Sequence, residues 1–74
     1  MSRYRVDYLT PRQEEILRCI RTAITDQGVA PTIGEIAAAV GMRSWSGVHY
    51  QLCELEVKGA IRRDPGRARG IRLA

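Results

Sequence analysis

Residues 41–52, GMRSWSGVHYQL, contain the side chains of this chain best suited to hydrogen bonding with a ligand. Ser44 is a typical N-cap, so a helix is predicted to begin directly after it. Val48, Leu52 and Leu55 follow at i, i+4 and i+7, the spacing of one buried helical stripe. With that stripe turned inward, small or hydrogen-bonding residues remain at the surface: Ser46, Gly47, His49 and Tyr50.

A helix with this surface favours close contact with DNA. Gly47 has no side chain to hold another surface away, and His49 and Tyr50 offer donors and acceptors. The N–H groups of a first turn lack partners within the helix and attract anions such as phosphate. Because a helix fits the major groove and its first residues reach base edges there, we expect helix 45–58 to read bases. The expected base-reading residues are Ser44, Ser46, Gly47, His49 and Tyr50.

Taken singly, these residues also fit simpler roles. Ser44 can be a cap alone, His49 a solvated side chain and Tyr50 a cover for an apolar edge. Trp45, the one tryptophan, fits either a lid over the core or a contact with phosphate or sugar. His49 and Cys53 could form a thiolate pair, but no third group is placed to orient it, so we expect no enzyme.

The basic residues gather at the end of the chain. Residues 1–57 carry six cations and seven acids, net −1, and residues 58–74 carry six cations and one acid, net +5, which together make the +4 of the chain. A basic end on a near-neutral body suggests a polyanionic partner, nucleic acid first. A solvated run of charge is the simpler alternative.

Chain length and cysteine content limit the classes of protein to which this sequence can belong. The 74 residues suffice for one domain, predicted over 1–74 with a core over 9–73. Cys19 and Cys53 lie far apart in no metal-binding spacing, so we interpret them as free thiols of an intracellular protein and expect no metal or cofactor. No apolar run approaches the roughly 20 residues that span a bilayer. A cytoplasmic, nucleoid-associated protein without membrane contact is therefore expected.

Local signals predict two further helices. Thr10 with Gln13, and Thr32 with Glu35, form capping-box patterns. An apolar stripe of helical period follows each box, and a glycine closes each stripe. The predicted helices are 11–27 and 33–40.

Two strands, 60–63 and 69–73, are predicted after the third helix. Ile61, Ile71 and Leu73 alternate with arginines, so these apolar residues are expected to face the core. The DPGR segment between the strands suits a type II turn. The fold class is thus mainly α with a small β part (α+β): a helix-turn-helix followed by a basic hairpin, which is a wing.

Two runs, LTPRQEEILRCIRTAITDQGVAPTIGEIAAAVGM and LCELEVKGAIRRDPGRARGIRL, resemble the N-terminal DNA-binding domain of the LexA (SOS) repressor family. The most telling segments are LTPRQ, PTIGEIA, the KG that closes the third helix, and RRDPGRARGIRL, which looks like the actinobacterial branch. The likeness covers about residues 9–73. It implies a winged helix-turn-helix that binds palindromic operator DNA as a pair of protomers and represses transcription.

The resemblance also implies contacts with the DNA backbone. In that family the third helix reads bases at positions that match the five residues above, and the wing contacts phosphates. The backbone contacts expected here are Thr32, Arg43, Trp45, Lys58, Arg63, Arg67 and Arg69.

Three departures from the family pattern matter. The family usually continues into a self-cleaving serine peptidase domain, whereas this sequence ends at Ala74, so we expect neither that activity nor that dimerisation surface. The outer residues of the third helix are not the usual reading set, so the operator sequence does not carry over. Tyr50, Cys53 and Val57 form a narrow apolar seam at i, i+3 and i+7. This seam leaves open a protein-interaction module, such as a small co-regulator or anti-repressor.

Overall fold

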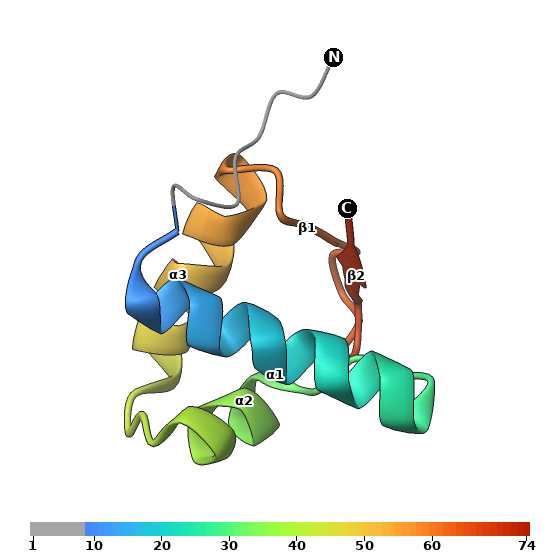
Figure 1. Cartoon of the computed structure of the whole chain (residues 1–74), viewed down its shortest axis with the longest axis horizontal. Helices are drawn as coiled ribbons and strands as arrows, with labels where there is room; N and C mark the ends of the chain where they lie inside the picture. The colour runs from blue at the N-terminus through green and yellow to red at the C-terminus, as the bar shows by residue number, and fades with distance from the viewer. Residues whose placement is uncertain (1–8) are drawn as a thin grey trace.

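Five elements follow one another in the order that the sequence predicts. The computed structural model describes residues 9–74, with α1 (Pro11–Gln27), α2 (Ile33–Val40), α3 (Trp45–Val57), β1 (Ile61–Arg63) and β2 (Ile71–Leu73). The helix bounds agree with the predicted ranges to within one residue, and both strands are shorter than predicted. Figure 1 shows α1 crossing the front of the molecule, with α2 beneath it, α3 to the left and the hairpin to the right.

Side-chain caps begin α1 and α2 as predicted. Thr10 Oγ1 accepts from the backbone N–H of Gln13 at 3.2 Å, and Gln13 Oε1 accepts from the backbone N–H of Thr10 at 3.1 Å. Thr32 and Glu35 repeat the arrangement at 3.1 and 2.9 Å. Each box satisfies two N–H groups that the helix itself leaves unpaired.

A tight turn joins α2 to α3. Gly41 ends α2 with φ of 73°, a left-handed conformation that glycine adopts without steric cost. Ser44 then caps α3, with its Oγ accepting from the Gly47 N–H at 3.1 Å. The two helices are therefore set at a fixed angle by only a few residues.

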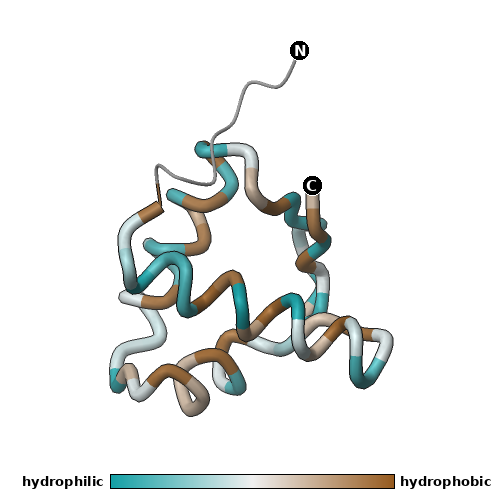
Figure 2. Tube along the Cα trace, viewed as in Figure 1, coloured by the Kyte–Doolittle hydropathy of each residue, from teal (hydrophilic) through white to brown (hydrophobic). Residues whose placement is uncertain are grey.

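One apolar core is built by all three helices and the hairpin. The predicted inward stripe of α3, Val48, Leu52 and Leu55, is fully buried, with 0% of each residue exposed. Figure 2 shows hydrophobic residues recurring along every helix, as this packing requires. The other largest buried side chains are Ile16, Leu17, Ile20, Ile36 and Ile61.

The prediction that Leu73 faces the core is wrong. Ile61 and Ile71 are buried as expected, but Leu73 is 40% exposed. Strand β1 packs against α3, whereas β2 pairs with β1 in the antiparallel register Ile61 to Leu73. Because β2 is the outer strand of a two-stranded sheet, its last residue stays at the surface.

Candidate nucleic-acid interface

The first turn of α3 lies at the surface. Ser44, Trp45 and Ser46 are all exposed, and the hydroxyls of Ser44 and Ser46 lie 2.8 Å apart. Ser44 is a true N-cap, and it also presents its hydroxyl beside that of Ser46. The tip of the predicted reading helix is thus open to a ligand.

Trp45 is not a lid over the core. It is 65% exposed, and its ring lies over Gly34 near the start of α2. A Cβ atom at Gly34 would come within 2.8 Å of Trp45 Cζ2. Because Gly34 has no side chain, the indole of Trp45 in α3 can pack directly against the backbone of α2. The sequence pattern singled out Trp45 but not this partner, which lies 11 residues earlier.

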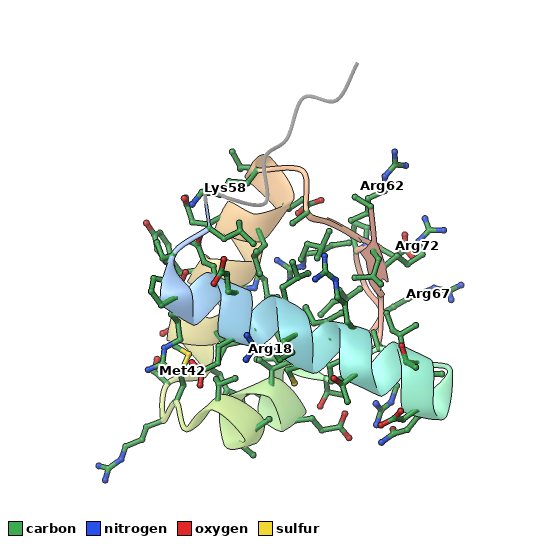
Figure 3. All side chains as sticks on the ribbon, in the orientation of Figure 1. Arg18, Met42, Lys58, Arg62, Arg67 and Arg72 are labelled. Carbon is green, nitrogen blue, oxygen red and sulfur yellow. The ribbon has the colours of Figure 1, made fainter. Side chains whose placement is uncertain are left out.

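Gly47 is half-buried, and the space beside it is partly filled. A Cβ atom at this position would lie 3.1 Å from the methyl carbon of Met42 in the turn. Figure 3 shows the Met42 side chain at the junction of α2 and α3. Gly47 thus lets the turn pack closely against α3, in addition to any role toward a ligand.

His49 connects α3 to the hairpin. Arg63, the last residue of β1, has Nη2 at 3.2 Å from His49 Nδ1 and Nη1 at 3.6 Å from Cys53 Sγ. His49 and Tyr50 are exposed, with Tyr50 at 60%. A hollow between α3 and the hairpin is lined by His49, Arg63 and Arg67 together with Glu56 and other residues.

Other hairpin arginines point outward. We call the hairpin, residues 61–73, the wing. Gly66 has φ of 81°, as the predicted type II turn requires at its second central position. Figure 3 shows Arg62, Arg67 and Arg72 extending from the wing away from the helices. Arg72 Nη2 lies 3.3 Å from Asp64 Oδ1 at the surface. Arg62 and Arg72 were not among the predicted backbone contacts, although their alternation with buried isoleucines marks them as outward-facing.

Arg69 is turned toward the protein. Its Nη1 and Nη2 donate to the two carboxylate oxygens of Glu35 at 2.8 and 2.9 Å, and Nη1 also donates to the Ala30 carbonyl at 3.1 Å. The Arg69 guanidinium, with the Thr32 backbone N–H, lowers the pKa of Glu35 to about 2. This geometry ties the wing to the start of α2 and disfavours a phosphate contact by the same guanidinium.

Lys58 is likewise engaged within the domain. Its Nζ donates to Gln13 Oε1 at 2.7 Å, and Gln13 Nε2 donates to Gln51 Oε1 at 3.0 Å. Gln13 is only 4% exposed. It therefore links α1 to α3 from inside the structure. The capping pattern identified Gln13, but no sequence signal revealed its long-range partners.

The predicted site residues thus fall into two groups. One faces outward around the start of α3 and along the wing. The other, Arg63, Arg69 and Lys58, makes intramolecular side-chain contacts, and Arg63 also lines the hollow between α3 and the hairpin. Arg43 is exposed in the turn, and Thr32 is half-buried at the cap of α2.

Burial, helped by Glu35, raises the pKa of the Cys19 thiol. Within residues 9–74, no helix is long and apolar enough to cross a membrane.

Three helices, a tight turn between the last two, and a basic hairpin beside the third define a winged helix-turn-helix domain. The sequence matches the family described as LexA DNA binding domain over residues 6–70. The chain therefore belongs to the LexA DNA-binding domain family.

Individual relatives agree with this assignment. The chain is 54% identical over 65 residues to a LexA repressor of Methylococcus capsulatus. The aligned segment covers 88% of this chain and 32% of that protein. The chain is 52% identical over 63 residues to the LexA repressor of Mycobacterium ulcerans, covering 85% of this chain and 26% of that protein. It is 51% identical over 65 residues to that of Mycobacterium leprae, covering 88% and 28%. The chain spans about a third or less of the length of these relatives, and the mycobacterial matches fit the actinobacterial resemblance.

Proposed function

We propose that this domain binds double-stranded DNA at specific sequences and represses transcription there, as a nucleoid-associated protein of the cytoplasm. The main supporting observation is the contact between His49 of α3 and Arg63 of the wing, at 3.2 Å. Because of it, a polar helix tip and a basic hairpin share one side of the molecule. A duplex could meet both at once.

Base reading is proposed for the start of α3. In the major groove, the exposed first two turns of this helix would face base edges. Ser44 and Ser46 offer hydroxyls, His49 and Tyr50 offer ring-borne polar groups, and Gly47 permits close approach. Trp45, seated on Gly34, would contact the sugar–phosphate backbone beside the groove.

Phosphate contacts are proposed around this helix. Arg67 extends from the wing and Arg43 lies exposed in the turn. Arg63, also expected in this group, lines the hollow beside α3 and contacts His49. Thr32 at the α2 cap offers a further contact. Lys58 and Arg69, which were expected in this group, are better suited to holding the helices and the wing in place.

Two protomers on one palindromic site are proposed for tight binding. A single winged module buries only about 600 to 1,000 Å² of protein surface on DNA. This is the low end for a specific complex, so a second copy or a partner protein would be needed for high affinity.

Selection of binding sites from random duplexes, followed by gel shifts over a salt series, tests this function. We expect a bipartite, mirrored site and a slope of log affinity against log salt near −5 if about six phosphates are neutralised. A flat salt response, or equal binding of all duplexes, would contradict the proposal.

A protein-interaction module is the second candidate. Val57 is 82% exposed and Tyr50 60% exposed on one face of α3, with Cys53 between them. Val57→Lys separates the two functions. DNA binding should survive or improve, whereas capture of a protein partner through this seam should fail. Glu54→Gln, elsewhere on α3, raises the net charge by the same one unit and is the matched charge control.

A further inference from the structure

We infer that His49 recognises guanine, because Arg63 holds its imidazole as a hydrogen-bond donor toward the DNA. This inference rests on the proposed function and deepens it. It makes His49 a specificity-determining residue, and it makes Arg63 a positioning residue that acts through His49.

The contact joins two elements that are distant in sequence. Arg63 ends β1, and its guanidinium spans one turn of α3, from His49 Nδ1 at 3.2 Å to Cys53 Sγ at 3.6 Å. His49 and Cys53 are four residues apart and so lie on the same side of the helix. Arg63 is half-buried, which limits the positions its side chain can take.

The chemistry of the two groups defines the tautomer. A guanidinium has five N–H donors and no acceptor. A hydrogen bond between Arg63 Nη2 and His49 Nδ1 therefore requires a lone pair on Nδ1. The imidazolium form has N–H groups at both positions and cannot accept. His49 is thus neutral in this contact, with its proton on Nε2.

The remaining nitrogen is available to a ligand. Among residues 9–74, no hydrogen bond reaches His49 Nε2, and the side chain is exposed in the second turn of α3. The charged neighbours that line the same hollow are Glu56, Arg63, Asp64 and Arg67. The ring consequently offers one N–H donor to whatever enters beside the wing.

Guanine is the base that matches such a donor. Its major-groove edge presents two acceptors, N7 and O6, and no donor. Thymine presents one acceptor, O4, beside its methyl group, cytosine presents a donor at N4, and adenine presents a donor at N6 beside its N7 acceptor, so guanine alone offers two acceptors. A group that only donates therefore favours guanine and disfavours cytosine at the same place.

The tautomer can be measured without DNA. The chain has a single histidine, so ¹⁵N-histidine labelling of the whole chain yields one imidazole in two-bond ¹H–¹⁵N spectra. At pH 8 we expect protonated Nε2 and unprotonated Nδ1. Arg63→Met should blur this pattern into a mixture of tautomers, and Arg62→Met on the same strand should not. A wild-type spectrum with the proton on Nδ1 overturns the inference.

The base preference is measured on duplexes selected from a random pool. We expect one G·C pair in each half-site at which His49→Ala abolishes the preference. Replacing that guanine by 7-deazaguanine, or by each other base in turn, should weaken wild-type binding by about five- to tenfold, as loss of one hydrogen bond predicts. His49→Ala should bind all these duplexes alike. Arg63→Met should weaken the preference for G·C at this position, and Arg62→Met should leave that preference unchanged.

The two failures are distinguishable. If wild-type protein binds all duplexes equally, the proposed function fails and the base contact fails with it. If a clear site emerges but no guanine in it depends on His49, the base contact alone is overturned.

Discussion

Arg69 and Glu35 form a two-point ion pair across 34 residues of sequence, with N–O distances of 2.8 and 2.9 Å. The same carboxylate completes the capping box of α2 by accepting from the Thr32 N–H at 2.9 Å. One side chain therefore stabilises the start of α2 and anchors the wing to it. Orientation of the wing is coupled to the helix-turn-helix through this pair.

Arg67 and Arg69 should behave differently toward DNA. Arg67→Gln should weaken binding to all sequences alike and reduce the magnitude of the salt slope by roughly one, because one phosphate contact is lost. Arg69→Gln should leave the slope unchanged, since its guanidinium binds Glu35. Glu35→Gln keeps the guanidinium but removes its partner carboxylate, so it should not reduce the magnitude of the slope. Equal loss of slope in the Arg67 and Arg69 variants would mean that Arg69 leaves Glu35 for the DNA.

The Glu35 carboxylate should make stability depend on pH at the acid end. Its pKa is lowered to about 2 in the folded domain, chiefly by Arg69, from an unfolded value of about 4.3. A lowered pKa stabilises the fold above the unfolded value, and this contribution is lost as pH falls toward 2. The melting temperatures of wild type and Glu35→Gln should differ most above pH 5 and converge near pH 2. A constant difference across this range would contradict the assignment.

Gly34→Ala should displace Trp45 rather than unfold the domain. The added Cβ would lie 2.8 Å from Trp45 Cζ2, but that ring is mostly exposed and free to swing away. Alanine also favours a helix over glycine by about 1 kcal/mol, so the free energy of unfolding should change by less than about 1 kcal/mol. Fluorescence of the one tryptophan should shift to longer wavelength. Ala38→Ser, on the exposed side of α2, should leave the emission unchanged.

Gln13→Ala should destabilise the fold. It removes the Gln13 side-chain half of the capping box of α1 and the hydrogen bonds that Gln13 makes with Gln51 and Lys58 at 3.0 and 2.7 Å. Loss of part of a cap and of two partly buried hydrogen bonds together costs about 2 to 4 kcal/mol. Urea denaturation measures this. Glu14→Ala, at the exposed neighbouring position, is the control. An equally small effect of both substitutions would show that the hydrogen bonds of the Gln13 side chain contribute little to stability.

Tyr50→Ala should change which base pair is preferred at one position of the site. The side chain is 60% exposed, so the fold should tolerate its loss. A good base contact contributes about 1 to 3 kcal/mol of discrimination, measured by competition among single-base variants of the selected duplex. Uniform weakening on every variant would assign Tyr50 to the backbone or to the protein-facing seam instead.

The elements themselves were predictable because their signals are local. A capping box, a left-handed glycine and an apolar stripe of helical period involve residues no more than a few positions apart. Thr10, Thr32 and Ser44 all cap the helices expected of them, and the inward stripe of α3 is buried as predicted. The class of fold and the exposed tip of the third helix followed directly.

What the sequence by itself determined, then, was the order of elements, the core-facing residues of α3 and the polar side chains left at its tip. Only the tertiary structure decided which arginines are directed to solvent and which to the protein. Arg69 and Arg67 are two residues apart in the same basic run, yet one binds Glu35 and the other extends outward. The seat of Trp45 on Gly34 and the exposure of Leu73 were decided in the same way. The physical reason is that a long side chain takes its partner from whatever packing brings within hydrogen-bonding distance, and no local pattern records that neighbour.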